Sequence, residues 1–139
     1  MATNEHGEDI YPVPVARSRI PALAITADIV SVIVFAAVGR ASHDESGDVL
    51  GLLATAAPFG LGLVAAWATP VVRARPAGLA AGLVVLAGTA VIGLLVRFAF
   101  LDRLPLSFAV VATCALGVLL LGWRGLAAAV AHRVAHRVR

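Results

Sequence analysis

The residues most suited to chemistry lie in one polar segment, GRASHDESGD, residues 39–48, which holds one arginine, one histidine and three carboxylates. His43, Asp44 and Glu45 are residue types that ligate metal ions. Adjacent residues do not share one face of a helix or strand, so they do not form the tetrahedral or facial set that a metal site needs. We therefore expect a solvated loop without a metal, in which Arg40 and His43 are the candidates for binding.

A second candidate is the histidine pair near the C-terminus. His132 and His136 are four residues apart in AHRVAHRVR, and Arg133 and Arg137 have the same spacing. An HxxxH pair can bind zinc on a helix, but the glutamate of HExxH and a third ligand are absent. Basic helices of this kind bind anionic lipid headgroups. We therefore expect a basic helical extension that lies on a lipid surface.

The sequence carries no enzyme motif. It has no GxSxG, P-loop or dinucleotide-binding fingerprint, and PFGLGL offers only a GxG inside an apolar run. The single Cys114 excludes a disulfide framework and a CxxC metal pair. We expect no catalytic residue, no cofactor and no enzyme activity.

The composition indicates what positions these residues. Of the 139 residues, 60% are hydrophobic and 14% are charged, whereas soluble domains carry about 25% charged residues. The mean hydropathy is +0.95. The eleven basic residues are all arginine, and they are not interleaved with aromatic residues as nucleic-acid binding requires. The apolar excess therefore faces lipid, and nucleic acid is not an expected partner.

Four apolar runs are long enough to cross a bilayer, which takes about 20 residues. Backbone groups in lipid must bond within their own segment, so each run is predicted to be a helix. The expected fold class is all-α, an integral membrane four-helix bundle in residues 20–124. A disordered cytoplasmic tail (1–19) precedes it, and a basic, helical cytoplasmic tail (125–139) follows. The predicted spans are 20–39, 49–69, 77–100 and 105–123.

The arginines indicate how the spans are oriented. Arg40, Arg97 and Arg103 belong to one side of the membrane. By the positive-inside rule, the side richer in arginine is cytoplasmic, so both termini are expected there and residues 39–48 outside. The first apolar run is longer than that of a cleaved signal peptide. The arginines on the cytoplasmic side are Arg17, Arg19, Arg73, Arg75, Arg124, Arg133, Arg137 and Arg139.

Small residues recur at helical spacing in the second and third spans, a pattern that lets membrane helices pack closely. Pro58 lies near the middle of the second span and is predicted to kink it. The small-residue faces fit plain packing, or a hinge or cavity at Pro58. The positions that we assign to packing or a hinge are Gly39, Pro58, Gly62, Gly78, Gly82 and Gly93.

Asp28 is the one carboxylate deep in a span, where an acid costs about 2.5–3.5 kcal/mol on insertion scales and usually marks function. The polar groups expected at its depth are neutral, so Asp28 is either a structural hydrogen-bond donor or a group that takes up and releases a proton. The predicted polar or proton site consists of Asp28, Ser31, Thr89 and Thr113.

Arg97 is not expected to pair with Asp28. The depth of Asp28 corresponds to Leu86 in the third span, eleven residues from Arg97, which is roughly 16 Å along a helix. We expect Arg97 to reach the outer interface and to meet Asp44, Glu45 or Asp102. Together with Arg40 it is a candidate site for an anion or a lipid headgroup. Trp123 and Arg124 are expected to anchor the fourth span at the opposite interface.

Three stretches resemble the membrane family named Domain of Unknown Function 3054. They are ADIVSVIVFAAVGRASH (27–43), LLATAAPFGLGLVAAW (52–67) and FAVVATCALGVLLLGWR (108–124), joined by the region around Arg97. The set D-x(10)-G-R-x-x-H, A-x-P-F and L-G-W-R covers about residues 24–124. The resemblance implies a small, multi-span protein of a prokaryotic plasma membrane, without an established activity. It draws attention to Asp28, Gly39, Arg40, His43, Pro58, Phe59, Arg97, Trp123 and Arg124.

Three functions remain open. The first is a small polytopic membrane protein that acts by association, as an accessory subunit of another membrane protein or as a homo-oligomer. The second is a proton-coupled small transporter that uses Asp28 and works as an oligomer. The third is a lipid-active membrane enzyme that uses His43 and the outer arginines, and it is the least favoured because no activated nucleophile or metal cluster is visible.

Overall fold

A computed structural model of the chain describes residues 19–44 and 47–138. The predicted disordered tail, 1–19, lies almost wholly outside the described residues. The described chain contains five helices and no strand. Four of the helices are long and apolar enough to cross a membrane. The all-α class of a multi-pass membrane protein, expected from the sequence, is confirmed.

The helix ends follow from local chemistry. Asp48 caps the second helix, where its carboxylate accepts hydrogen bonds from the N–H groups of Leu50 and Gly51. Pro70 begins a short helix inside the segment that was expected to be a plain connection. Asp102, in a left-handed conformation with φ of 52°, ends the fourth helix. The helices are α1 (Ile20–Ala41), α2 (Val49–Trp67), α3 (Pro70–Ala74), α4 (Leu79–Leu101) and α5 (Leu106–Arg137).

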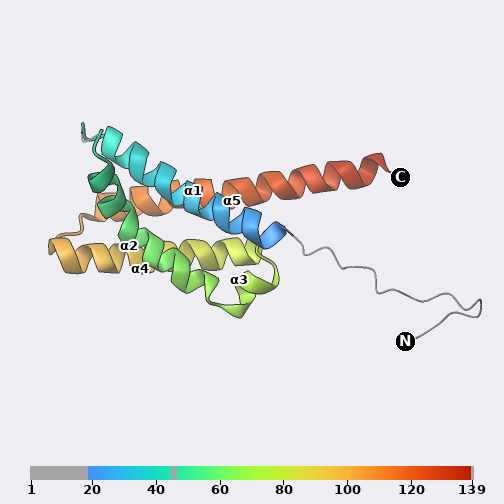
Figure 1. Ribbon diagram of the computed structural model, residues 1–139, viewed down its shortest axis with the longest axis horizontal. Coiled ribbons are helices and arrows are strands. Elements are labelled where there is room, and N and C mark those ends of the chain that lie inside the picture. Colours follow the sequence, from blue (N-terminus) through green and yellow to red (C-terminus); the bar gives the residue numbers. More distant parts are fainter. Residues whose placement is uncertain (1–18, 45–46, 139) are drawn as a thin grey trace, which may run out of the picture.

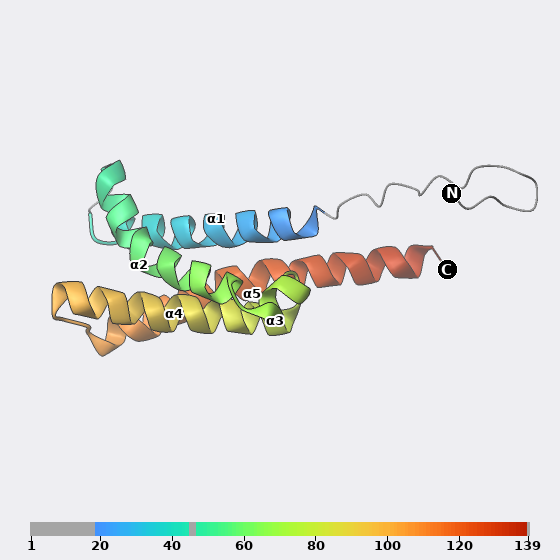
Figure 2. The same cartoon turned by 60° about the horizontal axis from the view of Figure 1, so that its bottom comes forward.

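The long helices pack in a ring of neighbours (Figures 1 and 2). α2 and α4 share the most extensive contact, α5 packs against α4, and α1 packs against both α2 and α5. The start of α1, the end of α2, α3 and the start of α4 lie at one end, which we call the terminal end. The ends of α1 and α4 and the starts of α2 and α5 lie at the opposite end, which we call the loop end. α5 runs on beyond the terminal end (Figure 2).

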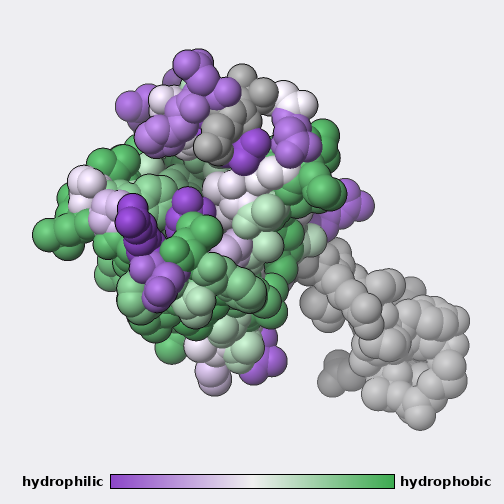
Figure 3. Space-filling view, turned by 90° about the vertical axis from the view of Figure 1, so that its left-hand side faces the viewer, coloured by the Kyte–Doolittle hydropathy of each residue, from purple (hydrophilic) through white to green (hydrophobic). Residues whose placement is uncertain are grey.

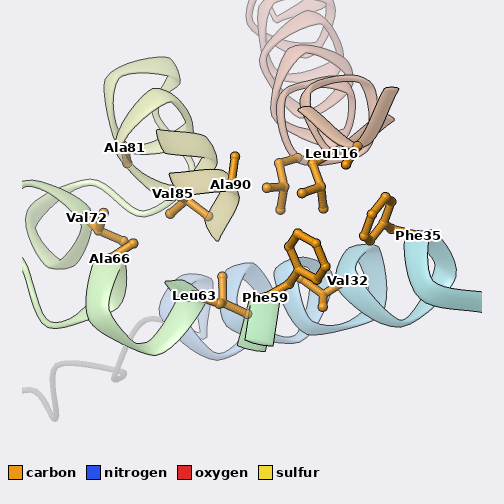
Figure 4. Close-up of a cluster of buried hydrophobic side chains, with 12 residues drawn as sticks. Val32, Phe35, Phe59, Leu63, Ala66, Val72, Ala81, Val85, Ala90 and Leu116 are labelled. Carbon is orange, nitrogen blue, oxygen red and sulfur yellow. The ribbon is translucent and has the colours of Figure 1, made fainter. Parts of the chain in front are cut away.

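A hydrophobic core fills the space between the helices (Figure 4). Phe59 of α2 is fully buried, and its ring meets that of Phe35 edge-on at 4.9 Å between centroids. Glycines bring α2 and α4 together: a Cβ on Gly62 would collide with the backbone of Gly88, and one on Gly93 would collide with Phe59. The core residues are Val32, Phe35, Phe59, Leu63, Ala66, Val72, Ala81, Val85, Ala90, Ala112, Leu116 and Leu120.

Two predicted packing positions are corrected. A Cβ on Gly39 would meet nothing within 4 Å, so this glycine is not needed for helix contact within the chain. Gly78 precedes the first turn of α4 in an extended conformation and caps it. It therefore belongs to the connection that contains Arg75 and not to a small-residue face of the helix.

Candidate functional site

A buried ion pair joins the first and last helices at the terminal end. Asp28 of α1 and Arg124 of α5 are both fully buried. Arg124 donates from Nη1 to Oδ1 of Asp28 at 2.7 Å and from Nη2 to Oδ2 at 2.8 Å. This is the bidentate geometry in which a planar guanidinium matches a carboxylate.

The two tryptophans of the chain complete the surroundings of the carboxylate. Trp67, the last residue of α2, donates from Nε1 to Oδ2 of Asp28 at 3.0 Å. Trp123 donates from Nε1 to Oδ1 at 2.9 Å. All four contacts of the carboxylate are with N–H donors, so the site matches a carboxylate that accepts hydrogen bonds and not a carboxylic acid that donates one.

The remaining donors of Arg124 are also used. Its Nε donates to the carbonyl of Pro76 at 3.1 Å, and Nη1 donates to that of Leu120 at 2.9 Å. The guanidinium lies 4.3 Å from the centroid of the Trp123 ring. Gly82 of α4 makes room for the side chain, since a Cβ there would lie 2.7 Å from Cδ of Arg124. The ion pair therefore ties α1 and α5 to the connection before α4.

This geometry overturns the expectation that Asp28 has only neutral neighbours. It also overturns the assignment of Arg124 as an interfacial anchor, because that side chain is 0% exposed. Asp28 follows Ile20 by eight residues, about 12 Å along the helix, and so lies near the terminal end. α5 continues thirteen residues past Arg124, which places the arginine level with Asp28.

The neutral residues expected around Asp28 are not its hydrogen-bond partners. The hydroxyls of Ser31 and Thr113 each donate to the backbone carbonyl four residues earlier, at 2.8 Å. The buried hydroxyl of Thr89 has no hydrogen-bond partner among the described residues. Both members of the ion pair belong to the sequence pattern D-x(10)-G-R and L-G-W-R, but the pattern alone did not predict that they pair.

A second polar site lies at the loop end, where the structure brings Arg40 and Arg97 to two shared cavities. The larger, about 600 Å³, lies between α2 and α4 and is also lined by Thr55, Pro58 and Phe100. The smaller, about 240 Å³, reaches between all four long helices and is lined by both arginines, His43, Thr55, Phe35 and Phe108. Hydrophilic residues gather at this end of the molecule (Figure 3).

The contacts of Arg97 differ from those expected. Its guanidinium lies 4.7 Å from the centroid of the Phe108 ring, on α5. No ion pair with Asp44 or Asp102 is formed, and Glu45 lies outside the described residues. Arg40 packs its guanidinium against Gly51, the third residue of α2. The arginines therefore line a wall that α1, α2, α4 and α5 build together.

The histidine pair of α5 is exposed. Nε2 of His132 and Nε2 of His136 are 3.1 Å apart. No group of three or more potential metal ligands occurs in residues 19–44 and 47–138.

Four helices are apolar and long enough to cross a membrane, and a buried ion pair joins the first of them to the last. These features define a multi-pass membrane protein. The chain belongs to the family described as Protein of unknown function (DUF3054), whose model matches residues 25–127. This confirms the resemblance seen in the sequence. The matched range includes the ion pair and both loop-end arginines. Searches of curated proteins and of solved structures each returned no match.

Proposed function

We propose that this protein acts by association, as a homo-oligomer whose copies meet along α5, and that it is not an enzyme. The observation that carries the proposal is the length of α5. Its 32 residues extend about 48 Å, whereas the hydrocarbon core of a bilayer is about 30 Å thick. Every residue of the part beyond Arg124, residues 125–137, is exposed. We call this part the α5 extension.

The surface of the α5 extension supports a helix partner. Leu126, Val130 and Val134 are spaced by four residues and are 68%, 53% and 57% exposed. Most of the stability of a helix in a protein comes from the packing of its apolar face, and every residue of the extension is exposed. The extension therefore gains stability if a second helix covers this apolar stripe.

Glycines on the same helix favour the same contact. A glycine costs about 1 kcal/mol in a helix relative to alanine. Gly62, Gly82 and Gly93 offset this cost because each allows a close approach inside the chain. A Cβ on Gly122 or Gly125 would meet nothing within 4 Å. Gly122 precedes Leu126 by four residues and so continues the apolar stripe, where a small residue with open space suits a neighbouring α5.

The membrane and the orientation belong to the same proposal. Four crossing helices bring both termini to one side. The arginines at the terminal end favour the cytoplasm for that side under the positive-inside rule. The α5 extension then projects into the cytoplasm of a prokaryotic cell, and the loop end faces outward. A partner membrane protein, for which this chain would be an accessory subunit, is the alternative occupant of the stripe.

The transporter hypothesis loses its main support. It depended on an intramembrane acid without a cationic neighbour. Asp28 instead binds Arg124 through two hydrogen bonds and accepts two more from tryptophans. The enzyme hypothesis gains none, since the hydroxyls of Ser42 and Thr55, which line the cavity with His43, both donate to backbone carbonyls, and the described residues contain no group of three or more metal ligands.

The test is the oligomeric state of the full chain. We expect light scattering in detergent micelles, and energy transfer between labelled copies in liposomes, to detect oligomers of the wild type. The double variant Val130→Glu/Val134→Glu should be monomeric in both measurements. The control, His132→Glu/His136→Glu, places the same two charges at the same spacing on the other face of the helix and should remain oligomeric.

A wild type that is monomeric in both measurements, or a stripe variant that still oligomerises, would contradict the homo-oligomer. In either case the accessory-subunit alternative becomes the function to test.

A further inference from the structure

We propose that the loop-end cavities bind the phosphate group of an anionic lipid, with Arg40 and Arg97 as its ligands and the α2–α4 groove as the seat of an acyl chain. This site is distant from the α5 extension, and the proposal is independent of the homo-oligomer proposed above. It assigns the two outer arginines a shared ligand of defined chemistry.

The positive charge of Arg97 favours an anionic ligand. Arg97 is half-buried on an apolar helix, four residues before the end of α4. Its guanidinium lies against the ring of Phe108, and the described residues provide it with no ion pair. No carboxylate is among the residues that line either cavity. An arginine within a membrane-spanning helix is stabilised by a bound anion, and guanidinium matches phosphate with two parallel hydrogen bonds.

The arrangement of the two arginines favours one anion between them. Arg40 comes from the end of α1 and Arg97 from the end of α4, yet both line the same two cavities. Both side chains end in a guanidinium group, which can match a phosphate ester with two parallel hydrogen bonds. The hydroxyl of Thr55 donates to the carbonyl of Gly51 at 2.9 Å, so the arginines provide the donors to the anion.

The remaining wall of the larger cavity is apolar, which selects a ligand with a hydrocarbon tail. Apart from the two arginines, the larger cavity is lined by α2 residues around Pro58 and by α4 residues around Phe100. Leu61, Phe100 and Leu101 are 58%, 83% and 53% exposed, so this wall continues onto the outer surface of the helices. Figure 3 shows hydrophilic and hydrophobic residues side by side at this end. A lipid would match both kinds of surface, with its headgroup at the arginines and its acyl chain along α2 and α4.

Pro58 contributes to the shape of this site. Proline has no N–H, so the hydrogen bond from residue 58 to the carbonyl of Ala54 is missing from α2. Both residues line the larger cavity. The hinge or cavity role that the sequence suggested for Pro58 thus has a location, next to the proposed acyl chain.

The experiment measures lipid binding to the full-length protein by native mass spectrometry from detergent. The probes are phosphatidylglycerol, phosphatidylcholine and inorganic phosphate. We expect phosphatidylglycerol to bind at least tenfold more tightly than phosphatidylcholine. Loss of one charge-assisted contact weakens binding about tenfold or more, so Arg40→Gln and Arg97→Gln should each bind phosphatidylglycerol at least tenfold more weakly. Arg97→Lys, which retains the charge, should recover part of the loss.

Arg103→Gln is the matched control, because Arg103 lies at the same end but lines neither cavity. Equal losses in the Arg103 and Arg97 variants, or wild-type binding by Arg40→Gln/Arg97→Gln, would overturn the proposal. Thermal unfolding identifies any variant that fails to fold, and the Lys variant then provides the test.

Inorganic phosphate separates the two sources of the anion. If millimolar phosphate leaves phosphatidylglycerol bound, the apolar groove contributes and the ligand is a lipid. If phosphate displaces the lipid fully while binding to the arginines itself, the lipid assignment is overturned and the site is one for soluble phosphate.

Discussion

Arg124 shows how strongly one buried side chain depends on its partners. It holds Asp28 through two hydrogen bonds and two carbonyls through two more. A buried ion pair contributes little to net stability compared with an apolar pair of the same shape, but removing one partner leaves an uncompensated charge, at a cost of about 3–5 kcal/mol. The pair therefore selects one arrangement of α1 against α5.

The first prediction concerns this pair. Asp28→Asn should lower the free energy of unfolding by about 3–5 kcal/mol, because Arg124 would remain buried with its charge uncompensated. Arg124→Gln should have a similar effect. The double variant Asp28→Asn/Arg124→Gln should recover part of the loss. Thermal unfolding followed by circular dichroism in detergent measures all four proteins, and single variants as stable as the wild type would show that the pair is not formed.

Arg124→Lys tests the geometry separately from the charge. Lysine keeps the positive charge but lacks the planar fork, so it cannot bond both carboxylate oxygens and the carbonyl of Pro76 together. We expect a variant of intermediate stability, with changed tryptophan fluorescence because Trp67 and Trp123 both contact Asp28. Unchanged fluorescence and stability would indicate that charge alone matters at this position.

At the scale of the helices, the contact between α2 and α4 depends on glycine. Gly62 and Gly88 face each other so closely that a Cβ on Gly62 would lie within the backbone of α4. Backbone cannot move aside as a flexible side chain can, so the helices would have to separate.

The matched variants are Gly62→Ala and Gly60→Ala. We expect Gly62→Ala to destabilise the protein by about 1–3 kcal/mol through overpacking. Gly60→Ala, two residues away and facing open space, should be neutral or more stable by up to about 1 kcal/mol because alanine favours the helix. The difference in unfolding temperature between the two variants is the measurement, and equal effects would contradict the close approach.

The helices themselves were largely predictable from the sequence. Apolar runs of membrane-spanning length allow only helices, and the first three long helices begin and end within two residues of the expected spans. The fourth span, expected to end at residue 123, instead continues as one helix to Arg137. The partner of Asp28 was not predictable in this way. Matching depths by residue count assumes that every helix ends at the same interface, whereas α5 continues far past Arg124. Arg40 and Arg97 could be named together as a candidate anion site, but the cavities that both of them line depend on packing.

At the scale of the whole molecule, the polar features lie at opposite ends. The ion pair closes the terminal end, the arginine-lined cavities open at the loop end, and the α5 extension projects from the packed helices (Figure 1). The extension is separate from the core because its residues are exposed throughout.

Truncation of the α5 extension should therefore abolish association but leave the stability of the packed helices nearly unchanged. Removing residues 129–139 leaves Arg124 and the last turn around it in place. We expect the truncated protein to unfold within a few degrees of the wild type, since no core residue is lost, and to be monomeric in light scattering because Val130 and Val134 are absent. A truncated protein that oligomerises normally would place the contact elsewhere on the molecule.

The ion pair also has a consequence for the biosynthesis of the protein. Asp28 and Arg124 are separated by 96 positions, and ribosomes add about 5–20 residues per second. In a chain inserted during translation, the carboxyl group is thus synthesised roughly 5 to 20 seconds before its arginine, and it enters the membrane earlier by a similar interval. During that interval the insertion machinery, or water within it, must accommodate the acid. The surroundings of Asp28 in α1 are then complete only when α5 arrives with Arg124.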